Sequence, residues 1–174
     1  MAQYLRPDSD DFNNNMQDES AGTINIYTSI DESTASDSDY ITNATSFNAD
    51  YKCTLSNPGD TPGSGTHTLR FRYRWVNSQM GDNFALNVTL EDSGFGPVYQ
   101  SNNNIATSWT TVTYSLNSTE IGNIDNYNNL TIQFAAMTED FNPPEDLVVE
   151  ISWAEFEVPD AATSGHPWFY GARE

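Results

Sequence analysis

Apolar and polar residues alternate along most of the chain, and this alternation predicts β-strands. In the stretch "FALNVTLE", Phe84, Leu86, Val88 and Leu90 fall on one face, and mostly polar residues fall on the other. A period of two places successive side chains on opposite sides of a strand. One apolar face and one polar face are typical of antiparallel sheets with a single buried side.

Similar patterns predict nine strands, at 24–30, 39–42, 50–55, 67–76, 84–92, 97–101, 108–116, 130–137 and 147–158. The breaks between them, such as "SNPGDTPGSG" and "FNPPED", are rich in turn-forming residues. One short helix is expected in "STEIGNIDNY", where Ser118 could cap the first turn and Ile121 and Ile124 share a face.

Eight or nine strands in about 135 residues predict an all-β fold, an antiparallel β-sandwich of jelly-roll type, over residues 23–158. Residues 1–22 are polar and acidic without periodicity, and we expect them to form an extended N-terminal arm. Residues 159–174 are expected to form a C-terminal linker and an aromatic tail that contains Trp168, Phe169 and Tyr170. These aromatic side chains either fold back on the sandwich or anchor the tail on a neighbouring subunit.

Charge narrows the range of partners. The 174 residues include 6 Lys and Arg against 25 Asp and Glu, which gives a net charge of −19. Binding to phosphate groups needs cationic surface, so neither nucleic acid nor an anionic membrane is an expected partner. The start of the chain lacks the basic and apolar regions of a secretory signal, and no apolar run approaches the roughly 20 residues of a membrane span. We therefore expect the protein to be made and to fold in a cytoplasm.

Residues for nucleophilic catalysis are scarce. Cys53 is the single cysteine and lies in an alternating stretch, so it is expected in the core. His67 and His166 do not belong to a serine or cysteine nucleophile pattern, and no glycine-rich phosphate loop, CxxC pair or HExxH occurs. We expect no enzyme. A glycosidase pair among the many carboxylates stays open, because that chemistry needs only two acids at a set separation.

The acidic stretch "IDESTASDSDY" raises the question of calcium. Asp31, Asp37 and Asp39 offer hard oxygen ligands of the kind that Ca²⁺ prefers, but the spacing of an EF-hand is missing. In so acidic a chain the same residues can simply be solvated. Apart from this weak calcium candidate, no cofactor is expected.

Half of the basic residues stand in one strand. In "LRFRYRW", Arg70, Arg72 and Arg74 face one way, and the aromatic residues between them face the core. The final strand could offer Glu150, Glu155 and Glu157 as partners across the sheet. The alternative is that the arginines meet an acidic surface on a second copy or another protein. Both arrangements can hold together, since three guanidinium groups carry many donors.

Four stretches, "LRPDSD", "SIDESTASDSDYI", "LRFRYR" and "VVEISWAEFEVPDA", occur in an order that resembles small jelly-roll structural proteins of tailed bacteriophages. The resemblance extends to about Ala161. It implies a noncatalytic virion component, assembled in the host cytoplasm: a decoration or cement protein that stabilises the head. Its implied partners are the major capsid protein and copies of itself in a homo-oligomer. The usual Trp-containing segment after "RPD" is replaced by "DFNNNMQDES", which leaves the role of the N-terminal arm open.

A carbohydrate-binding or host-recognition jelly-roll module, carried on a tail fibre or spike, is the alternative function. Jelly rolls often present exposed aromatic residues to sugars, and Tyr99, Trp109 and Tyr127 lie near expected loops. A glycan-degrading enzyme ranks below both, because so short a chain leaves little room for a deep cleft outside the sandwich.

Overall fold

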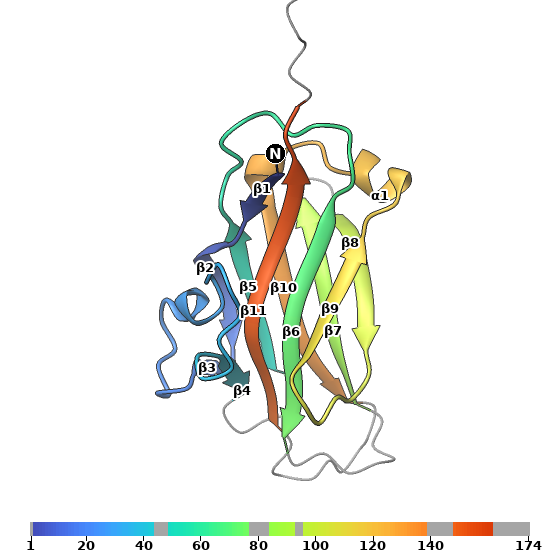
Figure 1. Ribbon diagram of the computed structural model, residues 1–174. Helices are drawn as coiled ribbons and strands as arrows, with labels where there is room; N and C mark the ends of the chain where they lie inside the picture. Colours follow the sequence, from blue (N-terminus) through green and yellow to red (C-terminus); the bar gives the residue numbers. More distant parts are fainter. Residues whose placement is uncertain (1, 44–48, 77–83, 93–95, 139–147, 162–174) are drawn as a thin grey trace, which may run out of the picture.

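The computed structural model describes residues 2–43, 49–76, 84–92, 96–138 and 148–161 (Figure 1). Within these ranges two antiparallel sheets form a sandwich. Sheet I has the order β3-β4-β11-β6-β9, with β1 paired to β11, and sheet II has the order β2-β5-β10-β7-β8. The strands are β1 (Ala2–Leu5), β2 (Pro7–Asn14), β3 (Met16–Asp18), β4 (Ile41–Asn43), β5 (Ala49–Leu55), β6 (Thr68–Val76), β7 (Phe84–Asp92), β8 (Gly96–Asn103), β9 (Thr110–Ser115), β10 (Leu130–Thr138) and β11 (Val148–Pro159).

The strand order confirms the jelly-roll fold. If β4 to β11 are counted as strands one to eight, sheet I runs one-eight-three-six and sheet II runs two-seven-four-five. Two interlocked Greek keys produce this arrangement. It places β6 beside β11, although the two strands are far apart in the sequence.

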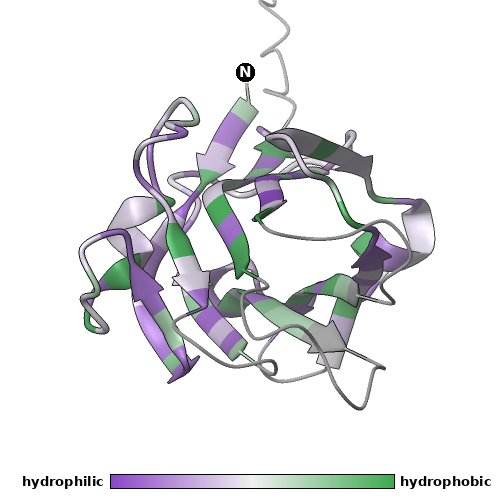
Figure 2. Cartoon of the chain, turned by 90° about the horizontal axis from the view of Figure 1, so that it is seen from below, coloured by the Kyte–Doolittle hydropathy of each residue, from purple (hydrophilic) through white to green (hydrophobic). Residues whose placement is uncertain are grey.

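The core lies between the two sheets and follows the alternating pattern. Tyr51, Phe71, Phe134 and Phe156 are fully buried, and the rings of Phe71 and Phe134 meet edge to face with centroids 6.2 Å apart. Figure 2 shows the alternation as green and purple bands along the strands. Cys53 is buried among these residues, as expected, and burial raises the pKa of its thiol.

The expected N-terminal arm is instead part of the sandwich. Residues 2–18 form β1, β2 and β3, which join both sheets at their edges. Two shifts of register occur where β2 pairs with β5, between Pro7 and Ser9 and between Asp10 and Phe12. Such irregularities disrupt the period of two, so a strand held by backbone pairing does not show in the sequence pattern.

The segment 24–30, expected as a strand, contains the short 3₁₀ helix η1 (Ile26–Ser29). The carboxylate of Asp10 accepts hydrogen bonds from the backbone N–H groups of Ile26 and Tyr27, at 3.3 and 3.1 Å. Ile26 and Ile30 are both buried. Their spacing resembles strand alternation, but it arises here from one helical turn whose first N–H groups a carboxylate binds.

The expected helix forms as α1 (Ser118–Gly122), with Asn117 rather than Ser118 as its cap. Asn117 and Glu120 form a capping box, in which each side chain accepts a hydrogen bond from the other residue's backbone. A second 3₁₀ helix, η2 (Tyr127–Asn129), leads directly into β10. No described helix is both long and apolar enough to cross a bilayer. The C-terminal tail, with His166 and Trp168, Phe169 and Tyr170, lies outside the described residues.

Candidate functional site

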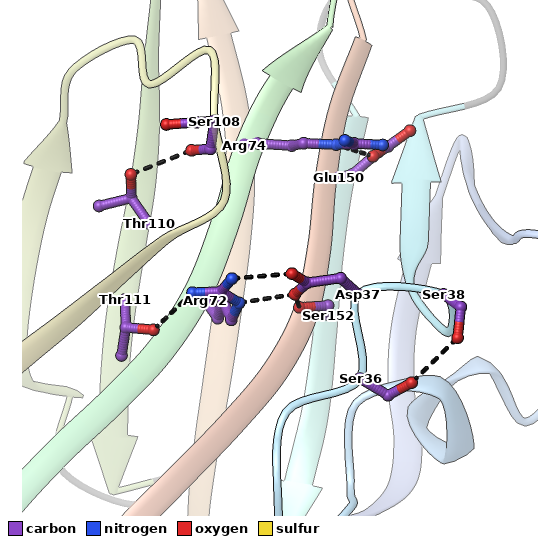
Figure 3. Close-up of polar contacts among 10 residues, drawn as sticks. All are labelled: Ser36, Asp37, Ser38, Arg72, Arg74, Ser108, Thr110, Thr111, Glu150 and Ser152. Carbon is purple, nitrogen blue, oxygen red and sulfur yellow. Dashed lines mark hydrogen bonds and ion pairs between the residues drawn. The ribbon is translucent and has the colours of Figure 1, made fainter.

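The arginine row on β6 is paired within the chain. Because β11 lies antiparallel beside β6, its outward carboxylates stand opposite the guanidinium groups. Arg70 binds Glu155 and Glu157. Arg74 binds Glu150, as Figure 3 shows. The predicted pairing with the last strand is therefore confirmed for these two arginines.

Arg72 has a partner that the sequence did not indicate. Its Nε and Nη2 donate to the two carboxylate oxygens of Asp37, at 2.6 and 2.8 Å (Figure 3). This contact fastens the segment before β4 to the outer face of sheet I. Arg72 also holds the pKa of Asp37 below its usual value by hydrogen bonding. Arg72 and Arg74 both lie over the ring of Trp109, at 5.8 and 4.7 Å from its centroid.

The three calcium candidates have different surroundings. Asp37 is bound to Arg72, whereas Asp31 and Asp39 lie near Glu32, a residue with a buried oxygen. Burial, assisted by Asp39 and Asp31, raises the pKa of Glu32 to about 7. Within the described ranges, no three His, Cys, Asp or Glu side chains are grouped so that they could hold a metal ion.

A cleft opens at the end of the sandwich that carries the N-terminus in Figure 1. Its volume is about 340 Å³. Two segments far apart in the sequence form its walls: Pro58, Gly59, Asp60, Thr61 and Pro62 on one side, and Asp125, Asn126, Tyr127 and Asn128 on the other. We call it the end cleft.

Hydrogen bonds to its backbone hold the first wall of the end cleft in place. The side chain of Gln3 donates to the carbonyl of Asp60 and accepts from its N–H, at 3.0 and 2.8 Å. Gly63 N–H donates to the carbonyl of Pro159 at 2.6 Å, and Ala161 N–H donates to that of Thr61. The wall is therefore tied to both β1 and the end of β11.

A buried carboxylate fixes the second wall. Asp92, which is fully buried at the end of β7, accepts hydrogen bonds from the backbone N–H groups of Asp125 and Asn126, at 2.9 and 2.8 Å. The side chain of Asn126 then accepts from the N–H of Asn128 and caps η2. These bonds hold Tyr127, a partly exposed residue, at the cleft.

Behind Tyr127 lies His67, which is fully buried and packs against Phe156. Its Nδ1 is 2.8 Å from the carbonyl oxygen of Gly65 and its Nε2 is 2.7 Å from the hydroxyl of Tyr127. A carbonyl can only accept, so Nδ1 donates and, in the neutral ring, Nε2 accepts from Tyr127. Burial lowers the pKa of His67, which favours that neutral ring. His67 thus links Gly65 and Tyr127 from within the core.

Of the three aromatic residues that the sequence suggested for sugar binding, only Tyr127 lines the end cleft. Trp109 lies beneath two arginines, and Tyr99 is buried and stacked on Tyr114 with centroids 4.1 Å apart. Asp60 and Asp125, on opposite walls, were not predicted. The segments around Asp60 and Asp125 are rich in turn-forming residues, which predicts two turns. This composition does not show that the two turns meet.

No protein-family model matches the sequence, and none of the curated proteins matches it. Among solved structures, a family 35 carbohydrate-binding module from Clostridium thermocellum has a TM-score of 0.44 at 15% identity, covering 92% of this chain and 99% of that one. A family 29 module from Piromyces equi has a TM-score of 0.41 at 10% identity and 95% coverage of each chain. The enzymatically active domain of tailspike protein 4 from bacteriophage CBA120 has a TM-score of 0.41 at 10% identity, over 91% of this chain and 19% of that one. Similarities this weak assign no function.

Proposed function

We propose that the protein is a carbohydrate-binding module without catalytic activity, and that the end cleft is its binding site. The observation that carries the proposal is Tyr127, a partly exposed aromatic residue that lines the cleft beside the polar residues Asp60, Asp125 and Asn128. A sugar presents an apolar C–H face and a rim of hydroxyl groups. The aromatic ring can cover the apolar face, and neighbouring polar side chains can bind the hydroxyls.

The polar groups at the cleft suit hydroxyl recognition. Asp60, Asp125 and Asn128 are exposed, and their side chains supply carboxylate acceptors and an amide that both donates and accepts. Hydrogen bonds on both walls hold these residues in place before any ligand arrives. Such preorganisation lowers the entropy cost of binding.

Capsid decoration, the function that the sequence resemblance implies, would use the arginine row and the aromatic tail as contact surfaces. Arg70, Arg72 and Arg74 already have carboxylate partners within the chain, so they no longer require an acidic neighbour. The aromatic tail lies outside the described residues. A carbohydrate-binding module on a tail fibre or spike remains compatible with the sequence resemblance to phage jelly-roll proteins.

A glycan array followed by isothermal titration with the strongest binder tests the proposal. Tyr127→Ala should abolish binding, whereas Phe12→Ala should leave it intact. Phe12 is a matched control because its side chain is 50% exposed on β2, outside the end cleft. Circular dichroism and thermal unfolding establish that both variants are folded. An array without a binder, or a folded Tyr127→Ala variant that binds normally, would overturn the proposal.

A further inference from the structure

Among the residues that the structure describes, the end cleft carries negative charge and no positive charge. Asp60 and Asp125 stand on opposite walls, and the described lining includes no Lys, Arg or His. Both side chains are exposed, and neither carboxylate has a hydrogen bond or ion pair with another residue in the part of the chain that the structure describes. Their charges are therefore directed to solvent or to a ligand.

The basic residues of the described chain are engaged elsewhere. Each of the five has at least one carboxylate partner on the outer faces of the sheets: Arg6 with Glu155, Lys52 with Glu91, Arg70 with Glu157, Arg72 with Asp37, and Arg74 with Glu150. The sixth, Arg173, lies outside the described residues. Recognition of a carboxylate, sulfate or phosphate on a sugar relies on a cation, and arginine is the usual choice. The described residues that line the end cleft include no such cation.

We propose that the end cleft selects sugars that carry a protonated amine and discriminates against acidic sugars. This inference rests on the proposed carbohydrate-binding function. A ligand ammonium group has three donors for the carboxylates of Asp60 and Asp125, and the face of Tyr127 attracts cations. A sugar carboxylate would face two like charges in a chain of net charge −19.

The test uses glycans that share one backbone and differ in the charged group that they carry. β-1,4-linked tetrasaccharides of glucosamine, glucose and glucuronic acid share one backbone geometry and are titrated at low salt. An array of amine-bearing, neutral and acidic glycans on other backbones accompanies them. We expect the amine-bearing member of each set to bind about three- to fivefold more tightly than the neutral one, and the acidic member most weakly. At about 1 M salt, where the Debye length is roughly 3 Å, the preference should shrink.

A pair of double variants assigns the preference to the two carboxylates. Asp60→Asn with Asp125→Asn should bring the ratio of amine-bearing to neutral affinity towards one. Asp8→Asn with Glu19→Gln removes the same charge from exposed positions outside the end cleft and should keep the ratio. If glycans bind but acidic members bind as tightly as amine-bearing ones, this inference fails and the proposed function stands. If no glycan binds, both fail.

Discussion

The hydroxyl of Tyr127 lies 2.7 Å from Nε2 of the buried His67. Tyr127 lines the end cleft, and its hydroxyl is hydrogen-bonded to the buried histidine behind it. One side chain thus joins the proposed binding surface to the interior. The two roles can be separated by substitution, because Tyr127→Phe removes the hydroxyl alone and Tyr127→Ala removes the ring and the hydroxyl together.

Tyr127→Phe removes the hydroxyl and keeps the ring. Nε2 of His67 then loses its partner in a buried position, and the free energy of unfolding should fall by about 1–3 kcal/mol. Glycan affinity should fall less than in Tyr127→Ala, since the aromatic face remains. Urea denaturation and isothermal titration measure the two effects. A Phe variant as stable as the wild type would show that the hydrogen bond contributes nothing to folding.

Arg74→Gln leaves Glu150, whose side chain is 9% exposed, without its guanidinium partner. A carboxylate left unpaired in so buried a position should lower the free energy of unfolding by about 1–3 kcal/mol. The comparison is Asp37→Asn, which alters a pair whose carboxylate side chain is 42% exposed and should cost less than about 1 kcal/mol. Chemical denaturation of both monomers gives the values, and the reverse order would contradict the burial argument.

Gly63→Ala should disrupt the first wall of the end cleft. A Cβ atom there would lie 2.4 Å from the backbone oxygen of Asp160, which cannot rotate away as a side chain can. The hydrogen bond from Gly63 to Pro159 must lengthen, with a loss of about 1–3 kcal/mol in stability and weaker glycan binding. Gly122→Ala, with no atom within 4 Å of its added carbon, is the control and should change stability by less than about 1 kcal/mol. Thermal unfolding and titration of both variants check this, and equal behaviour would contradict it.

Glu32 should make stability depend on pH. Its pKa rises from an ordinary 4.5 to about 7 in the folded chain, chiefly through burial. Between these values the folded state binds more protons than the unfolded state, so the free energy of unfolding falls as pH increases across that window. Glu32→Gln removes this contribution, and wild type should lose stability relative to the variant from pH 4.5 to 7. Urea denaturation of both proteins across this range measures the difference.

The comparison with the variant at each pH is necessary because His67 acts in the opposite direction. Its pKa is lowered by burial, so the unfolded chain binds more protons below the ordinary value of 6.5. The stability that the neutral His67 contributes is present above that pH and is lost as the pH falls through the folded pKa. Wild type and Glu32→Gln share this effect, so it cancels in their difference. Parallel stability curves would mean that Glu32 has no such role.

The alternating pattern was sufficient to predict the strands that build the core. Apolar residues of β7 and β10 face the core and alternate with mostly polar residues on the other face, so the orientation of residues such as Leu86 and Ile132 can be read from their neighbours in sequence. The partners of Arg70 could also be predicted, because β11 lies beside β6 and offers Glu155 and Glu157 at every second position near its end. Glu150, the partner of Arg74, is an odd number of residues from Glu155. The two glutamates share one face because the register of the pairing shifts between Ile151 and Trp153.

The strands at the N-terminus do not show this alternation of apolar and polar residues. Backbone hydrogen bonds hold β2 on β5, and the two shifts in their register remove the periodicity by which a strand is recognised. Asp37 likewise lies in a loop, where nothing local indicates that its carboxylate reaches Arg72.

The sequence by itself determined the sandwich, its aromatic core and the outward-facing row of arginines, because these features follow from a period of two that each strand carries alone. Only the tertiary structure decided that residues 58–62 and 125–128 form one cleft. The two turns meet because the jelly roll returns β10 to the side of β5, and because the buried carboxylate of Asp92 and the side chain of Gln3 bind their backbones. Contacts between distant segments depend on the path of the whole chain, and no local pattern encodes them.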